Sequence, residues 1–190
     1  GKRPDGYHEI ETLLVSVSVF DSLLFRATDD GEIVIRCRWA AGVSAIAARP
    51  LADESAAREL HPSEIPSGPE NLAWRAAALL KRRAEVSLGS EIDLVKRIPA
   101  AAGLGGASSD AAAALVAANA AWGIGWSRER LAELARELGS DIPFFLAGGA
   151  AIGRGRGECI EEVSTTRLNM VIVKPPVGLS TPTVYQSCQP

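Results

Sequence analysis

The chain has 190 residues, of which 47% are hydrophobic and 23% are charged, and its formal net charge is -3 at pH 7. This length suits one domain of moderate size, or one domain with part of another, and excludes a peptide or a very small domain that is held together by disulfides. The composition is ordinary for a globular protein, and the slightly acidic balance offers no basic field that would favour nucleic acid as a partner.

The cysteines and the apolar segments indicate in which cellular compartment the protein is expected. Cys37, Cys159 and Cys188 are odd in number and far apart, and the chain has only 2 histidines, so neither a disulfide framework nor a zinc site is indicated. No apolar run approaches the ~18 residues of a membrane span, and the opening "GKRPDGYHEI" lacks the hydrophobic region of a signal peptide. We therefore expect a cytoplasmic protein with no membrane partner.

The first third of the chain has the pattern of strands. After the turn signal at residues 4–6, Val15, Val17 and Val19 alternate with serines, which predicts one long half-buried strand within residues 8–25. Residues 33–36 are expected to be its partner, because "TDDGE" between them is typical of a β-hairpin or meander.

The middle of the chain contains a predicted helix and strand behind an irregular stretch. Residues 39–70 are predicted to be an insertion or a surface excursion of the chain, with room for one short helix at 52–60. A helical face begins at Asn71 and continues to Arg83, and residues 91–96 alternate as a strand.

A glycine-rich loop and a series of helices follow. The pattern predicts helices from about Ser109 to Trp122, from a cap at Ser127 to Gly139, and as a short turn around Pro143. Residues 150–158 and 168–176 are then expected to be strands. This order favours an α+β layer structure over a doubly wound sheet.

The loop "IPAAAGLGGASSDA" has the features of an anion site. A strand that enters a glycine loop and then a helix gathers backbone N–H groups and the positive end of the helix dipole at one point. Gly103, Gly105 and Gly106 allow close approach of a phosphate, and the hydroxyls of Ser108 and Ser109 can bind phosphate oxygen or help to hold Mg²⁺.

Two familiar phosphate loops do not match, and one alternative stays open. No lysine follows Gly106 as the P-loop requires, and the third glycine of the dinucleotide fingerprint is missing. The alternative is that the small residues only permit tight packing, which is the expected role of the alanines in residues 111–118. For the loop itself we favour phosphate binding.

The segment "PAAAGLGGASSDAA" resembles the phosphate-binding motif of the GHMP small-molecule kinases, P-x-x-x-G-L-G-S/G-S/G-S-S/A. The blocks "RPDGYHEIETL", "NLAWRAAALL", "LGSDIPFFLAGGAAIGRGRGE" and "KPPVGLSTPTVY" are similar, in the same order, to the members of that superfamily that act on a cytidine-diphosphate-linked methylerythritol. The joint resemblance covers most of the chain.

The resemblance implies an ATP site. The residues that would wrap the ATP phosphates are Pro99, Ala100, Ala101, Ala102, Gly103, Leu104, Gly105, Gly106, Ala107, Ser108 and Ser109. Asn71 and Lys96 would lie near the purine or ribose, and Ser109 would help to hold Mg²⁺. ATP and Mg²⁺ are thus the expected cofactors.

The resemblance also implies a catalytic residue and a substrate site. Asp141 falls at the family's catalytic aspartate, which faces the hydroxyl to be phosphorylated, whereas the pattern alone favours an N-cap of the next helix. Tyr7 and His8 would meet the cytosine, with a solvent-facing strand start as their alternative, and Tyr185 matches an aromatic position near the cytidine. The small-molecule substrate is therefore expected to bear a cytidine diphosphate.

The chain departs from the family pattern at both ends. The family's catalytic lysine lies on a strand that would precede Gly1, and the later glycine-rich motif of the second domain would follow Pro190. Leu14 also stands where an aromatic residue is often found. We expect that both ends are cut and that this piece alone has little or no kinase activity.

The fold implied by the resemblance is the N-terminal domain of a GHMP kinase, shared with domain 2 of ribosomal protein S5, over residues 1–163, followed over 164–190 by the start of a ferredoxin-like domain. The implied reaction is ATP-dependent phosphorylation of the erythritol 2-hydroxyl, in the non-mevalonate isoprenoid pathway. The alternatives are a homoserine or mevalonate type of GHMP kinase, and a non-catalytic binding module on the same fold.

Overall fold

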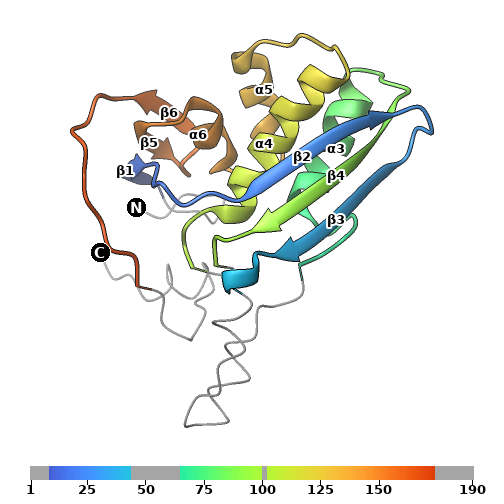
Figure 1. The fold of residues 1–190 in the computed structure, drawn as a ribbon. Coiled ribbons are helices and arrows are strands. Elements are labelled where there is room, and N and C mark those ends of the chain that lie inside the picture. Colours follow the sequence, from blue (N-terminus) through green and yellow to red (C-terminus); the bar gives the residue numbers. More distant parts are fainter. Residues whose placement is uncertain (1–8, 44–64, 100–101, 174–190) are drawn as a thin grey trace.

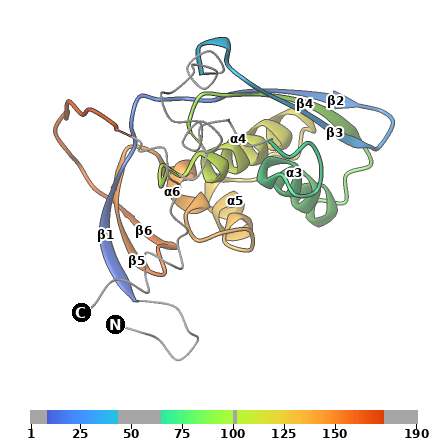
Figure 2. The same ribbon diagram turned by 90° about the horizontal axis from the view of Figure 1, so that it is seen from below.

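The structure is a computed structural model that describes residues 9–43, 65–99 and 102–173. Within these ranges the chain forms two three-stranded sheets and a group of helices between them (Figures 1 and 2). The expected α+β class is confirmed. The predicted helix at 52–60 lies outside the described residues.

The larger sheet has β4 (Gly89–Lys96) at its centre, between β2 (Ser22–Thr28) and β3 (Ile33–Trp39). β4 runs antiparallel to β2 and parallel to β3, so Ile92 pairs with Phe25 on one side and with Ile35 on the other. The predicted hairpin between β2 and β3 is therefore wrong. Residues 29–32 instead span the roughly 9.6 Å between the two outer strands. β4, which buries every second side chain, lies between those strands.

The smaller sheet has the order β1 (Ile10–Val15), β5 (Ala150–Gly155), β6 (Cys159–Glu162), with antiparallel pairs throughout. The predicted single strand within residues 8–25 is wrong, since β1 and β2 belong to different sheets. Residues 16–21 connect them in an extended stretch (Figure 1). The alternation of valines and serines runs on through this stretch, but the backbone changes partners after Ser16, whose N–H donates to Gly149 O at 2.8 Å.

The helices α3 (Leu72–Arg83), α4 (Gly106–Ala121), α5 (Arg128–Ala135) and α6 (Ile142–Ala147) form the second layer. α3 and α4 pack against each other and cover one face of the larger sheet (Figure 2), while α6 lies between α4 and the smaller sheet. The helices predicted within the described residues are found, and the predicted Ser127 cap accepts from Arg130 N at 3.3 Å, but α5 ends at Ala135 and not at the predicted Gly139. α4, however, begins three residues earlier than predicted.

Alanines make the contact between α3 and α4 close. The predicted packing role of the alanines in residues 111–118 is confirmed for the buried ones, because side chains this small let the helix backbones approach, whereas Ala113 is exposed. The buried members are Ala73, Ala76 and Ala77 of α3 and Ala111, Ala112, Ala114 and Ala118 of α4. Ile92 and Leu94 of β4 meet them from the sheet.

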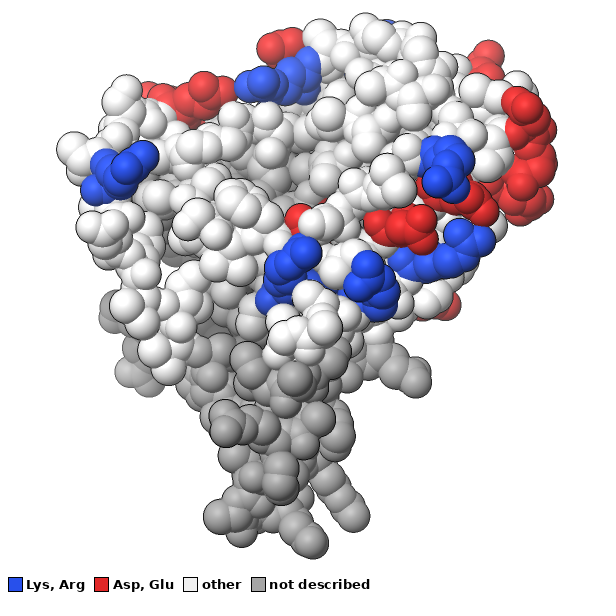
Figure 3. Space-filling model, in the orientation of Figure 1, with Lys and Arg blue, Asp and Glu red and all other residues white. Residues whose placement is uncertain are grey.

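The other face of the larger sheet is solvated and mixed in charge. Glu91 at its centre accepts from Arg26 at 2.7 Å and from Arg36 at 3.1 Å. Basic and acidic side chains interleave on the face shown in Figure 3. The described part of this face thus has no uniform basic surface of the kind that binds nucleic acid.

Residues 163–173 have no regular secondary structure, so the strand predicted from Leu168 is not found in its described part. Val171 and Val173 are exposed there. β6, which the sequence pattern did not predict, precedes this stretch. The predicted domain boundary at residue 163 stays a prediction. No helix in the described ranges has the length and apolar character needed to cross a bilayer.

Candidate active site

Two clefts meet at the glycine loop. The first, of about 430 Å³, runs from the start of α3 to the loop, and the second, of about 680 Å³, lies between residues 14–21 and helices α4 and α6. Both volumes are in the usual range for small-molecule sites. The residues that line both clefts are Gly103, Leu104, Gly105, Asp110 and Asp141.

The first cleft brings together most of the predicted ATP-binding residues. Its lining includes Asn71, Lys96, Pro99, Ala102, Gly103, Leu104, Gly105, Gly106, Ala107 and Ser108. Segments about 30 residues apart in sequence thus share one surface. Ala100 and Ala101, and the predicted substrate residues Tyr7, His8 and Tyr185, lie outside the described residues.

A glycine stands at each of the three loop positions for a different structural reason. Gly103 has φ +69° and open space where a Cβ would stand, so its surroundings admit a ligand. Gly105 also has a left-handed φ of +64°, and a Cβ there would meet the Phe145 ring at 2.6 Å. Gly106 is required by packing, since its Cβ would lie 2.9 Å from Ile98 Cγ2. The packing alternative therefore holds for Gly106 and in part for Gly105, and Gly103 is the glycine open to a ligand.

The start of α4 has no side-chain cap. Gly105 occupies the N-cap position, and the first turn contains no acidic residue. Ser109 N makes the first helical hydrogen bond, to Gly105 O at 2.8 Å, so the N–H groups of residues 106–108 precede the intrahelical pattern. They are therefore available to an anion at the positive end of the helix dipole. Ser108 and Ser109 lie inside the first turn of α4.

The serines face different clefts. Ser108 lines the first cleft and Ser109 the second. Ser109 Oγ donates to Gly106 O at 2.8 Å, which leaves its oxygen lone pairs available for a cation. No group of three or more His, Cys, Asp or Glu side chains in the described ranges could hold a metal ion.

Asn71 contributes to the cleft as a cap. Its Oδ1 accepts from Ala73 N at 2.9 Å, and its Nδ2 donates to Pro66 O at 2.8 Å and to Cys37 Sγ at 3.4 Å. This buried side chain thereby fixes both the start of α3 and the preceding loop. Its predicted contact with the purine or ribose stays a prediction.

Lys96 does not reach freely into the cleft. Its Nζ donates to Asp110 Oδ2 at 2.6 Å and to Asp21 Oδ2, and the three side chains are 9%, 7% and 4% exposed. Burial raises the pKa of Asp110 to about 6, although the Lys96 ammonium opposes this rise. The predicted contact of Lys96 with the nucleotide likewise stays a prediction.

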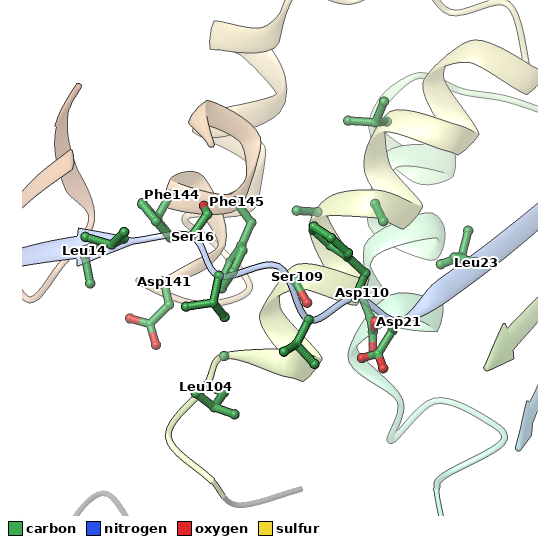
Figure 4. Close-up of a pocket in the computed structure, with 18 of the residues that line it drawn as sticks. Leu14, Ser16, Asp21, Leu23, Leu104, Ser109, Asp110, Asp141, Phe144 and Phe145 are labelled. Atoms are coloured by element: carbon green, nitrogen blue, oxygen red, sulfur yellow. The ribbon is translucent and has the colours of Figure 1, made fainter. Parts of the chain in front are cut away.

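Asp141 stands at the rim shared by both clefts (Figure 4). It has the N-cap position of α6, yet its side chain makes no capping hydrogen bond. Its Oδ1 accepts from Ser140 Oγ at 3.1 Å, and the side chain is exposed. Asp141 therefore has the N-cap position that the alternative predicts, but its carboxylate caps no backbone N–H group.

The second cleft is mostly apolar around a few polar groups. Its walls include Val17, Val19 and Phe20 of the connecting stretch, Val116 of α4, and Phe144 and Phe145 of α6. The rings of Phe144 and Phe145 contact each other edge to face, with their centroids 5.2 Å apart. Ser16, Asp21, Ser109, Asp110 and Asp141 supply the polar groups.

Comparisons with known proteins agree with this geometry. The model of the GHMP kinases N terminal domain matches residues 71–149, from the cap of α3 to the residue before β5. The chain is 48% identical over its whole length to the 4-diphosphocytidyl-2-C-methyl-D-erythritol kinase of Pelotomaculum thermopropionicum and 42% identical to that of Synechococcus sp. strain CC9902. The chain has the fold of the GHMP kinase N-terminal domain.

Solved structures confirm the GHMP kinase fold. A crystal structure of 4-(cytidine 5'-diphospho)-2C-methyl-D-erythritol kinase matches all of the chain with a TM-score of 0.69 and 33% identity, and the chain covers 59% of that structure. Homoserine kinase from Cytophaga hutchinsonii matches with a TM-score of 0.54 at 19% identity, which bears on the fold alone. The chain spans 58% and 55% of the length of the two curated kinases.

The sequence did not reveal two residues of the candidate site. Asp21 lies in the middle of an apparent strand, and Asp110 follows the two serines of the loop. Neither shows a pattern in sequence that links it to Lys96, because the three residues meet only when β2 and α4 flank the end of β4. Asp110 could have been noticed as the one charged residue of α4.

Proposed function

We propose that the protein to which this chain belongs is a kinase that transfers the γ-phosphate of ATP to the 2-hydroxyl of 4-diphosphocytidyl-2-C-methyl-D-erythritol. The observation that carries the proposal is the position of Asp141 at the rim shared by two clefts, one of which contains the uncapped start of α4. The names of relatives that are 48% and 42% identical supply the substrate.

The ATP phosphates would bind at the start of α4. The N–H groups of residues 106–108 and the open surface at Gly103 fit a phosphate chain, since no side chain caps these N–H groups and the first turn of α4 contains no acidic residue. The adenine and ribose would extend toward Trp39, Pro66 and Asn71 at the other end of the first cleft.

Magnesium fits the site only together with the nucleotide. Mg²⁺ is commonly bound by one or two protein oxygens and by substrate phosphates, so the lack of a metal-binding cluster among the described residues is compatible with it. Ser109 Oγ would be one ligand. Bound there, the ion would neutralise charge that develops on the transferred phosphate.

Asp141 would act on the acceptor hydroxyl. Phosphoryl transfer depends on positioning and charge stabilisation, so a carboxylate that orients the hydroxyl and accepts its proton is sufficient for this role. The second cleft would hold the methylerythritol. Tyr7, His8 and Tyr185 stay predicted contacts of the cytidine, and a cytoplasmic location is part of the same proposal.

The test uses a full-length chimera that contains this chain, called the full-length frame below. The segments of the Pelotomaculum kinase that lie outside the match are joined to both ends of the chain, and ADP release is measured with the cytidine-bearing alcohol, homoserine and mevalonate. We expect turnover with the first substrate only, and loss of turnover by at least about a hundredfold in Asp141→Asn. Asp29→Asn, which changes an exposed carboxylate in the β2–β3 connection, is the matched control.

Two results would overturn the proposal. Preference for homoserine or mevalonate would assign the site to another branch of the family. Full activity of Asp141→Asn, with Asp29→Asn equally active, would remove Asp141 from the reaction.

A further inference from the structure

A buried ion network joins three separate parts of the chain. Asp21 ends the connection between the sheets, Lys96 ends β4, and Asp110 lies in the second turn of α4. Lys96 donates to both carboxylates, and none of the three side chains is more than 9% exposed. Figure 4 shows the carboxylates of Asp21 and Asp110 side by side.

The network closes the base of the glycine loop. The loop leaves the sheet at Lys96 and enters α4 at Gly106, so the Lys96–Asp110 bond connects its two ends. Asp21 Oδ1 also accepts from Arg97 N and from Ile98 N, the latter at 2.9 Å, which fixes the first residues of the loop. Lys96 Nζ lies only 3.3 Å from the point where a Gly106 Cβ would stand.

The network also lies between the two clefts. Lys96 lines the first cleft, Asp21 lines the second, and Asp110 lines both. α4 packs against α6, which has Asp141 at its N-cap position, so the network fixes a helix that lines both clefts.

We propose that Asp110 is a positioning residue of the nucleotide site, which acts through Lys96 to hold the start of α4 and the glycine loop in the geometry that binds phosphate. The inference rests on the proposed function. It assigns Lys96 to this internal network and not to a direct contact with the nucleotide.

A second way in which Asp110 could act must be separated from this one. Two carboxylates and one ammonium leave the network with an excess negative charge, and a charge close to the phosphate site would weaken binding. Asp110→Asn removes the charge and keeps an oxygen that can accept from Lys96. Asp110→Ala removes both, while Lys96 keeps its bond to Asp21.

The experiment compares these two variants with the unchanged chain. ATP dissociation constants are measured by calorimetry, and amide hydrogen exchange of residues 103–109 is measured without nucleotide. Glu91→Gln is the matched control, because Glu91 is an ion-paired carboxylate on the same sheet that faces away from the helices. Circular dichroism checks that every variant is folded.

We expect Asp110→Ala to raise the ATP dissociation constant by about tenfold or more and to speed exchange in residues 103–109. Asp110→Asn and Glu91→Gln should leave both quantities within about twofold of the unchanged chain.

The outcomes that contradict the inference differ from those that contradict the proposed function. Unchanged affinity and exchange in Asp110→Ala, with ATP still bound by the unchanged chain, would overturn the inference alone. Tighter binding by both Asp110 variants would assign the effect to charge and overturn it as well. Absence of ATP binding to the unchanged chain, even in the full-length frame, would overturn the proposed function and the inference with it.

Discussion

Lys96 Nζ and Asp110 Oδ2 lie 2.6 Å apart in the interior and join the end of β4 to the second turn of α4. The cost of burying an ion pair can exceed the attraction between its charges, so such a pair is weak evidence for stability. Its location at the base of the glycine loop is better explained by the geometry that it imposes on the loop. The same pair gives the fold a specific dependence on pH.

Asp110→Asn should become more stable relative to the unchanged chain as the pH rises. Burial raises the pKa of Asp110 from 3.8 to about 6, so between these values the folded chain keeps a proton that the unfolded chain has released. The contribution of Asp110 to the free energy of unfolding is thus present in full below the lower value and is lost as the pH rises through the higher one. Asparagine does not titrate.

The measurement is urea unfolding of both proteins at several pH values between about 4 and 7. The other groups that face Asp110 are Lys96, Asp21 and the Cys37 thiol, whose own pKa is raised by burial, so it remains neutral in this range. A difference in unfolding free energy that does not change with pH would contradict the prediction.

Substitution of the three loop glycines by alanine should rank their structural roles. Gly103→Ala should cost about 1 kcal/mol, because the left-handed backbone is strained but no neighbour is near. Gly105→Ala should cost more, because the same strain is joined by a contact with the Phe145 ring. Gly106→Ala should also destabilise, by displacement of Ile98.

Thermal unfolding of the three variants checks this order. Phe145→Leu combined with Gly105→Ala serves as the control, since a shorter side chain should recover part of the loss. Equal destabilisation by Gly103→Ala and Gly105→Ala would mean that the contact with Phe145 is relieved without cost.

Asn71→Ala should lower the free energy of unfolding by about 1–2 kcal/mol, because it removes the cap of α3 and the bond to Pro66. Asn71→Ser, which keeps a capping oxygen, should recover about half of the loss. Ser127→Ala, which removes the exposed cap of α5, is a comparison expected to cost less. Urea unfolding of the three variants gives these values, and equal stability of Asn71→Ala and the unchanged chain would contradict the prediction.

Much of the secondary structure could be predicted from the sequence, whereas strand pairing could not. Helical periodicity and caps located α3, α4 and α5, because these signals lie within one segment. The order β2-β4-β3 depends on β4, and the separation of β1 from β2 depends on β5, and both of these strands are distant in sequence from their partners. The continuous alternation from Val15 to Val19 gave no sign that the backbone leaves one sheet for another.

The candidate site shows a similar division. The loop "GLGGASS" and Asp141 carry recognisable motifs, and the structure brings both to one rim. The motif alone could not distinguish the roles of its glycines, because Phe145 and Ile98 become neighbours only through tertiary packing. The network of Asp21, Lys96 and Asp110 could not be predicted for the same reason, since its members are 75 and 14 residues apart.

Ser90→Ala should leave the chain as stable as before or raise the free energy of unfolding by about 1 kcal/mol. Ser90 is fully buried on the helix-facing side of β4, and its hydroxyl has no hydrogen-bond partner among the described residues. Removal of a buried polar group without a partner removes its desolvation cost, and alanine leaves almost no cavity. Ser90→Val should destabilise, because it adds volume where the helices pack closely. Urea unfolding of both variants tests this, and a loss of more than about 1 kcal/mol in Ser90→Ala would show that the hydroxyl is bonded in solution.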